Sequence, residues 1–217
     1  MERKKYATYE IEEELGLDYI IGIDEVGRGP GAGPVTAGAV WIPKEHLPKL
    51  LVKIRDSKTL TEKRRDEMYK LIDETCVWAV ASVDNVTIDE INILNATKLA
   101  MKKAVAKLAI KLAPPISSAP AHIDHLLIDG TVKLDDVWVP QTQVIKGDQK
   151  SISIAAASIM AKVTRDEEMR TLHWIYPEYG WIRNKGYLTK EHVEAIKTYG
   201  ITDYHRKSFR KVGDYNG

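Results

Sequence analysis

The sequence predicts an α/β protein built on a mixed five-stranded sheet, and the order of its apolar runs carries this prediction. Residues 19–24 and 35–42 are short apolar or β-branched runs joined by a glycine-rich turn, which favours an antiparallel strand pair. Three further strand-like runs, residues 77–83, 126–129 and 138–145, alternate with segments of helical periodicity. Strands that come first and then alternate with helices are typical of a mixed sheet flanked by helices.

Helices are expected where apolar residues recur at helical spacing, in residues 61–74, 88–112 and 151–170. Thr61 is a suitable N-cap for the first of these helices, and the second is expected to start at Thr87 or Asp89. Two consecutive prolines at residues 114–115 stop the second helix, because proline cannot continue a helix.

The length of 217 residues fits one domain, or one domain with a small appendage. We expect a polar lead-in at residues 1–18 and a core at residues 19–170. Tyr, Pro and Gly are scattered through residues 171–217, which indicates short helices and loops. These last residues are therefore expected to form a helical C-terminal extension packed on the core.

Composition and charge indicate a globular protein and leave its partner open. Hydrophobic residues make up 44% and charged residues 29%, which is usual for a soluble protein. No apolar run has the length of a membrane helix or follows the N-terminus as in a signal peptide, so neither a membrane partner nor export is expected. The single cysteine, Cys76, favours a reducing compartment and hence the cytoplasm. The net charge of +1 does not by itself indicate nucleic acid, and the basic residues at 206–211 fit a binding patch and a solvated tail equally well.

Acidic residues directly follow two of the expected strands. Asp24 and Asp129 each end an apolar run, Glu25 follows the first of them, and Asp148 precedes the third helix. Ligands of α/β sheets gather at the carboxyl ends of strands, so these acids can meet at one edge. Clustered carboxylates need cations, and an all-oxygen set without Cys or His favours Mg²⁺ or Mn²⁺, the ions suited to phosphodiester hydrolysis. Each Asp taken alone is also typical of a turn or a helix cap.

The glycine-rich loop, residues 27–33 (Gly-Arg-Gly-Pro-Gly-Ala-Gly), lies between the first two expected strands. It fits neither a dinucleotide-binding motif nor a Walker motif, because it runs into Pro34 and a strand where those motifs open a helix. Glycines let a backbone approach a nucleic-acid strand closely, and Arg28 can add a charge-assisted hydrogen bond. A tight turn without a ligand is the alternative.

These motifs resemble those of the ribonuclease HII family in kind and in order. The similarity spans residues 20–209 and begins with residues 22–34 (Gly-Ile-Asp-Glu-Val-Gly-Arg-Gly-Pro-Gly-Ala-Gly-Pro). It continues at residues 56–58, 127–130, 146–148, 151–166, 176–177, 184–187 and 205–209. The resemblance implies an RNase H-like fold, with the catalytic core at residues 19–170 and the helical extension after it. One position departs from the family pattern: this chain has Leu188 where a second glycine commonly follows the tyrosine.

The resemblance also implies which residues form the site. The catalytic residues, which would bind two Mg²⁺ or Mn²⁺ ions, are Asp24, Glu25, Asp129 and Asp148. The residues that would bind substrate are Gly27, Arg28, Gly29, Lys58, Lys146 and Tyr187. Among these, the Gly-Arg-Gly segment would sense the ribose 2′-OH, the group that distinguishes RNA from DNA, and Tyr187 would pack on the adjoining deoxyribose.

A chain with these residues is expected to be an endonuclease that acts as a monomer. It would hydrolyse the RNA strand of RNA–DNA hybrids and incise on the 5′ side of ribonucleotides embedded in duplex DNA, leaving 3′-OH and 5′-phosphate ends. One alternative is an HIII-type ribonuclease, which handles lone ribonucleotides poorly and normally has an N-terminal module for which residues 1–18 leave no room. The other is a catalytically silent nucleic-acid-binding protein of the same fold, which clustered acids disfavour because they repel phosphate.

Overall fold

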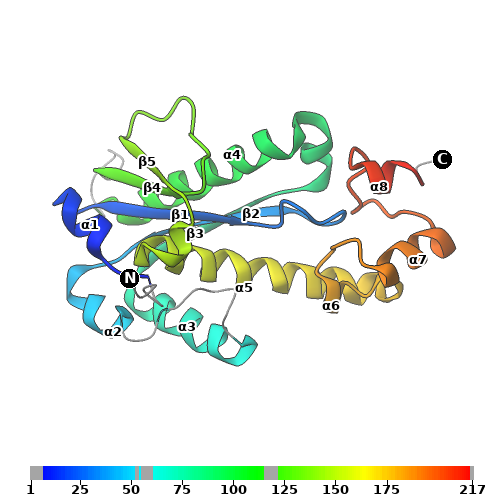
Figure 1. Ribbon diagram of the computed structural model, residues 1–217, viewed down its shortest axis with the longest axis horizontal. Coiled ribbons are helices and arrows are strands. Elements are labelled where there is room, and N and C mark those ends of the chain that lie inside the picture. The colour runs from blue at the N-terminus through cyan, green and yellow to red at the C-terminus, as the bar shows by residue number, and fades with distance from the viewer. Residues whose placement is uncertain (1–6, 52–53, 55–60, 115–121, 216–217) are drawn as a thin grey trace, which may run out of the picture.

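Five strands form one mixed sheet in the order β3-β2-β1-β4-β5 in the computed structural model, which describes residues 7–51, 54, 61–114 and 122–215 (Figure 1). The strands are β1 (Ile20–Val26), β2 (Val35–Trp41), β3 (Val77–Val83), β4 (His125–Asp129) and β5 (Gln141–Val144). β1 pairs antiparallel with β2, and β2 with β3, whereas β1 pairs parallel with β4, and β4 with β5. The predicted mixed sheet is confirmed, although β5 begins only after Pro140, whose nitrogen has no proton to donate to a neighbouring strand.

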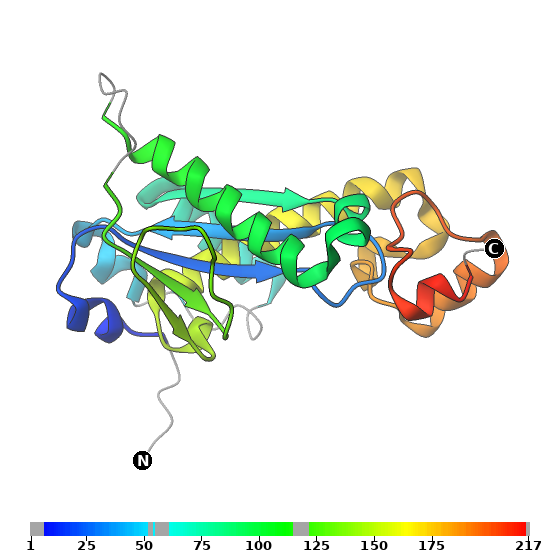
Figure 2. The ribbon, with the colours of Figure 1, turned by 90° about the horizontal axis from the view of Figure 1, so that it is seen from above.

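Helices cover both faces of the sheet and continue beyond one end of it (Figures 1 and 2). The helices are α1 (Glu10–Leu15), α2 (Leu47–Leu51), α3 (Glu62–Thr75), α4 (Asn85–Leu112), α5 (Ile152–Ile175), α6 (Trp181–Asn184), α7 (Lys190–Tyr199) and α8 (Arg210–Gly213). α4 packs on one face of the sheet, and α5, with α2 and α3 beneath it, packs on the other.

Alternation along β1 divides its side chains between these two layers. Ile21 and Ile23 are fully buried in the cluster that contains α4, and Ile20 joins the cluster on the α5 side. Gly22 faces α5 so closely that a Cβ there would lie 2.1 Å from the backbone carbon of Ser153. This glycine therefore lets α5 approach the centre of the sheet.

Thr61 caps α3 as predicted, because its Oγ1 accepts a hydrogen bond from the Arg64 amide (3.4 Å). The predicted start of α4 at Thr87 or Asp89 was wrong. Asp84 is the N-cap and accepts a hydrogen bond from the Thr87 amide (2.8 Å), so the helix begins three residues before the first apolar position of the pattern. α4 also has a kink at Asn92, whose φ of 66° is not helical.

The boundary expected at residues 170–171 falls inside α5, which runs to Ile175. Met169 of α5 is fully buried and packs with Trp181 and Ile196 of the extension. The helix is therefore shared between the sheet and the extension, and this continuity fixes the extension relative to the core.

The lead-in contributes a buried carboxylate to the core. Glu12 of α1 is 1% exposed, and its Oε1 accepts hydrogen bonds from Ser151 Oγ (2.6 Å) and the Ser153 amide (3.1 Å) at the start of α5. An acid at a helix N-terminus is favourable because the first amides there lack partners. Glu12 thus anchors the region where the segment carrying Asp148 enters α5.

Candidate functional site

Asp24 and Asp129 stand side by side on neighbouring parallel strands. Ile23 pairs with Ile128 in the register of β1 and β4, so the next residue of each strand is an aspartate. Adjacent strands lie about 4.8 Å apart. Leu127 belongs to the cluster on the α5 side, and alternation places Asp129, like Asp24, on that same face. The sheet register thus brings together the two carboxylates that the sequence predicted to meet.

The Asp24 carboxyl is 4% exposed, and its pKa is raised well above its usual range. Burial is the largest cause of the raised pKa, followed by the negative charges of Glu25 and Asp129. Hydrogen bonds from the Ser158 hydroxyl and from the Glu25 amide (2.7 Å) oppose the shift. The ionised form of Asp24 is therefore destabilised, because too little positive charge lies close to it.

The two carboxylate oxygens of Glu25 differ: one is hydrogen-bonded, and the other has no partner among the described residues. Its Oε1 accepts a hydrogen bond from Arg28 Nη1 (3.2 Å). Its Oε2 is buried and has no hydrogen-bond partner among the described residues. Burial raises the pKa of Glu25, the Arg28 charge lowers it, and the Asp129 charge raises it. A buried carboxylate oxygen without a donor is costly unless a cation or water meets it.

Asp148 lies in a short 3-10 turn, Gly147–Gln149, between β5 and α5, and is 1% exposed. The Gly147 amide beside it donates a 2.6 Å hydrogen bond to Asp129 Oδ1. This bond ties the turn that carries Asp148 to the end of β4. Lys146, one residue before the turn, is exposed and has left-handed backbone angles (φ 56°).

The candidate metal-ligand atoms at this edge of the sheet are all carboxylate oxygens. Such a set fits Mg²⁺ or Mn²⁺, whereas zinc prefers nitrogen and sulfur ligands. The orphaned Glu25 Oε2 and the raised pKa of Asp24 also fit a place for a cation. Within the part of the chain that the structure describes, no group of three or more His, Cys, Asp and Glu side chains is already arranged to hold one metal ion.

The glycine-rich loop lies beside Tyr187, which is far away in the sequence. A Cβ on Gly29 would lie 3.3 Å from Tyr187 Cε1. The Gly31 amide donates to the Gly186 carbonyl (2.9 Å), so backbone pairing holds the two segments together. Arg28 and Tyr187 are exposed, and Tyr187 is 49% exposed. The structure thus brings together the Gly-Arg-Gly segment and the tyrosine, whereas Lys58 lies outside the described residues.

Several residues around the site were missed by the sequence reasoning. Ser158 donates to Asp24, and its only signal was its place in the run of small residues that starts α5. Arg165 and Arg206 are fully buried and bind backbone carbonyls next to the loop. Arg165 and Arg206 lie in motifs quoted for the family resemblance, but periodicity gave no sign that either arginine is buried.

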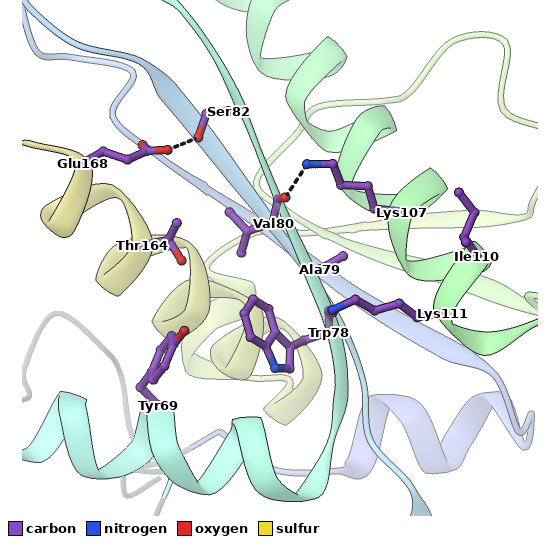
Figure 3. Close-up of a pocket in the computed structure, with 10 residues that line it drawn as sticks. All are labelled: Tyr69, Trp78, Ala79, Val80, Ser82, Lys107, Ile110, Lys111, Thr164 and Glu168. Atoms are coloured by element: carbon purple, nitrogen blue, oxygen red, sulfur yellow. Dashed lines mark hydrogen bonds between the residues drawn. The ribbon is translucent and has the colours of Figure 1, made fainter.

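A separate hollow of about 830 Å³ lies along β3, the edge strand farthest from β4 and β5 (Figure 3). Lys107 and Lys111 of α4 donate to the Val80 (3.2 Å) and Trp78 (2.8 Å) carbonyls of β3. Lysines on the free carbonyls of an edge strand oppose pairing with another chain. This hollow contains one acidic side chain, Glu168, and is therefore a poor candidate for the predicted metal site.

None of the helices in the described residues combines the length and apolar character needed to cross a membrane.

Comparisons with known proteins identify the family. The family model described as ribonuclease HII matches residues 21–212. The ribonuclease HII of Clostridioides difficile (strain 630) is 47% identical over 215 residues, which cover 97% of this chain and 78% of that protein. The solved ribonuclease H2 of Pyrococcus horikoshii OT3 has a TM-score of 0.72 at 24% identity, covering 90% of this chain and 96% of that chain. Bst-RNase HIII, solved in complex with Mn²⁺, has a TM-score of 0.69 at 23% identity, covering 91% of this chain and 69% of that chain.

These comparisons support the fold and the family at different levels. The two solved structures share less than a quarter of their residues with this chain, so they show the fold, and the expected RNase H-like class is confirmed. The family model and the similarity to the Clostridioides difficile protein cover nearly the whole chain. The chain therefore belongs to the ribonuclease HII family and is a ribonuclease H.

Proposed function

We propose that this protein hydrolyses the RNA strand of RNA–DNA hybrids and incises on the 5′ side of ribonucleotides embedded in duplex DNA. The observation that carries the proposal is the place of the crowded acids, Asp24, Glu25 and Asp129. Asp24 and Glu25 stand at the end of β1 and Asp129 at the end of the neighbouring strand β4, and the loop that follows β1 lies against Tyr187. A site for phosphodiester chemistry and a surface for reading a sugar are thus adjacent along one strand and its loop.

Four acids would hold divalent Mg²⁺ or Mn²⁺ ions at this site: Asp24, Glu25, Asp129 and Asp148. Bound ions of this kind supply an activated water and neutralise the leaving 3′-oxygen, so that the products carry 3′-OH and 5′-phosphate ends. The residues themselves orient the ligand oxygens. The Ser158 hydroxyl and the Glu25 amide hold Asp24, and the Gly147 amide holds Asp129. The Mn²⁺ complex of the HIII-type structure, which shares the fold, is consistent with this choice of ion.

The glycine-rich loop and Tyr187 would read the junction between RNA and DNA. Gly27, Arg28 and Gly29 would meet the ribose 2′-OH through their backbone, because glycine permits close approach. Tyr187, which lies beside Gly29, would pack on the adjoining deoxyribose. Lys146 would contact the phosphate backbone from the turn before α5, and we propose the same role for Lys58.

The enzyme is proposed to work as a monomer in the cytoplasm, with RNA–DNA hybrids and ribonucleotide-containing duplex DNA as its substrates. An HIII-type preference and a catalytically silent binding protein are the competing outcomes of the experiment below. The fold does not separate them, because an HIII-type structure matches it as well as an H2 structure does.

The test compares two duplexes at equal concentration, one a uniform RNA–DNA hybrid and one a DNA duplex with a single ribonucleotide. With Mg²⁺ or Mn²⁺ the protein should cut both, and the cut in the second should fall on the 5′ side of the ribonucleotide. EDTA should abolish both reactions, and end analysis should show 3′-OH and 5′-phosphate. Cutting of the hybrid alone would support the HIII-type alternative, and binding without cutting would support the silent one.

A further inference from the structure

Two arginines beneath the glycine-rich loop are buried, and no carboxylate in the described part of the chain pairs with them. Arg165 of α5 and Arg206 of the extension are both 0% exposed and are among the largest fully buried side chains. Among the described residues, no acidic side chain accepts a hydrogen bond or forms an ion pair with either guanidinium. Every hydrogen bond that they donate goes to a backbone carbonyl. A buried cation is costly, so such an arrangement needs a specific reason.

The carbonyls that Arg206 binds belong to the loop. Its Nη2 donates to Gly27 (2.6 Å), its Nη1 to Arg28 (3.0 Å) and its Nε to Gly33 (2.9 Å). The rigid fork of the guanidinium therefore fixes both ends of the loop relative to each other.

Arg165 joins the far end of the loop to the segment of Tyr187. Its Nε donates to Pro34 (2.8 Å), its Nη2 to Ala32 (3.3 Å) and its Nη1 to Lys185 (3.0 Å). Gly27 must be a glycine beside this side chain, because a Cβ there would lie 2.1 Å from Arg165 Nε. Arg165 thus couples the loop to the residues just before Tyr187.

Inward carbonyls force the neighbouring amides outward. In a trans peptide the C=O of one residue points opposite to the N–H of the next. The Gly27 and Arg28 carbonyls point to Arg206, so the Arg28 and Gly29 amides point away from it, at positions that are exposed. Two neighbouring outward amides at an exposed turn can donate to an oxygen acceptor of a nucleic acid.

Burial and proximity lower the pKa of both guanidinium groups. Burial is the larger cause for Arg206, and the Arg165 charge adds to it, lowering the Arg206 pKa to about 9. Burial likewise lowers the pKa of Arg165. An arginine side chain keeps its proton near neutral pH, so positive charge lies under the exposed loop, where it favours a polyanion.

We propose that Arg165 and Arg206 are positioning residues for ribonucleotide recognition, because they hold the backbone of residues 27–29 and the Tyr187 segment in one fixed geometry. The inference rests on the proposed function, since it concerns how the junction is read. It predicts that these arginines matter more for a single embedded ribonucleotide than for a uniform hybrid, which offers many ribonucleotides in many registers.

The experiment measures kcat and KM on both duplexes for the parent, Arg206→Lys and Arg165→Lys. Lysine keeps the charge but cannot bind three carbonyls with a planar fork. For Arg206→Lys we expect kcat/KM on the single-ribonucleotide duplex to fall about thirtyfold, mostly in kcat, because a small displacement of reacting groups is costly. We expect kcat/KM on the hybrid to fall less than about threefold. Arg165 donates no hydrogen bond to residues 27–29, so Arg165→Lys is the milder second variant. It should lower the ratio of kcat/KM on the single-ribonucleotide duplex to kcat/KM on the hybrid by about fivefold.

Tyr179→Phe is the matched control for stability. It removes the hydrogen bond from Tyr179 Oη to the Gly200 carbonyl (2.9 Å) in the extension but keeps the ring, and neither arginine donates a hydrogen bond to Tyr179. It should lower the melting temperature while leaving the ratio of the two activities unchanged. The proposal is overturned if both lysine variants keep the parent's ratio within about twofold, or if Tyr179→Phe changes the ratio as much as they do. A parent that does not incise at a single ribonucleotide would overturn the proposed function itself, and that result is visible before any variant is made.

Discussion

At the neighbouring ends of β1 and β4, three carboxylates are crowded together, whereas two guanidiniums are buried under the loop that follows β1. The acids are incompletely satisfied, since Glu25 Oε2 has no partner among the described residues and the pKa of Asp24 is raised. The guanidiniums each donate three hydrogen bonds to carbonyls. The difference is that the loop proposed to read the ribose is already held by hydrogen bonds within the protein, whereas the acids proposed to bind metal leave a buried oxygen without a partner among the described residues.

The largest effect should come from removing one acid. Asp24→Asn should lower cleavage by about a thousandfold, because a lost metal ligand removes about 4 kcal/mol of transition-state stabilisation. The same change should leave folding stability unchanged or raise it, because it relieves repulsion with Glu25 and Asp129. Cleavage rates and thermal melting would be measured on the same preparation.

Asp135→Asn is the control for the loss of an acid at a distance from the site. Asp135 is exposed, and its carboxylate pairs with Lys98 (2.6 Å). It should keep full activity. Mn²⁺ should raise the melting temperature of the parent and of Asp135→Asn but not that of Asp24→Asn, because an ion that binds only the folded state stabilises it. Metal-dependent cutting at the parental rate by Asp24→Asn would contradict the assignment.

A second effect concerns the extension, where a pair of buried histidines supports the backbone of Tyr187. His192 Nδ1 contacts the Tyr187 carbonyl (2.9 Å), which can only accept, so the proton of His192 is on Nδ1. His205 Nδ1 accepts from the Thr202 amide (2.9 Å), so its proton is on Nε2 and points at His192 Nε2 (3.1 Å). The network is complete only when both rings are neutral.

Acid should therefore destabilise this region. Burial and then the neighbouring His192 lower the pKa of His205 from 6.5 to about 4. Between these two pH values the unfolded chain binds a proton that the folded chain does not, so stability falls as pH falls from 6.5 to 4. This one group should cost about 3 kcal/mol over that window. Urea unfolding of the parent and of His205→Gln across the window would measure the effect, and equal slopes for the two proteins would contradict it.

A third and smaller effect concerns Arg28, which connects the two regions by its ion pair with Glu25. Arg28→Ala should reduce incision at a single ribonucleotide about tenfold, because the loss of one charge-assisted hydrogen bond has an effect of about that size. It should change cleavage of the hybrid less. It should also raise the Glu25 pKa further, since the Arg28 charge now lowers it. Arg28→Lys keeps the charge and should recover part of the preference. The ratio of rates on the two duplexes is the measurement, and an unchanged ratio in Arg28→Ala would remove Arg28 from recognition.

The sequence predicted the acidic side of this comparison better than the recognition side. Asp24 and Asp129 could be placed together because apolar runs reveal strands, and strand ends in such sheets converge. The burial of Arg165 and Arg206 depends on tertiary contacts with carbonyls more than a hundred residues away. Local pattern carries no information on such contacts. The start of α4 was also missed, because the N-cap Asp84 precedes any apolar periodicity.

The smallest effect tests the position where the chain departs from the family pattern. Leu188 packs against Gly31, where an added Cβ would lie 2.7 Å from its side chain, and it joins the apolar cluster of the extension. Leu188→Gly should lower the free energy of unfolding by about 2 kcal/mol, from lost apolar burial and added backbone freedom. The ratio of activities on the two duplexes should change less than about twofold, because Asn184 and His192 hold the Tyr187 backbone independently. Leu188→Ala separates the lost side chain from the gained flexibility, and a severalfold rise in junction preference in the glycine variant alone would show that Leu188 restrains the tyrosine through the backbone.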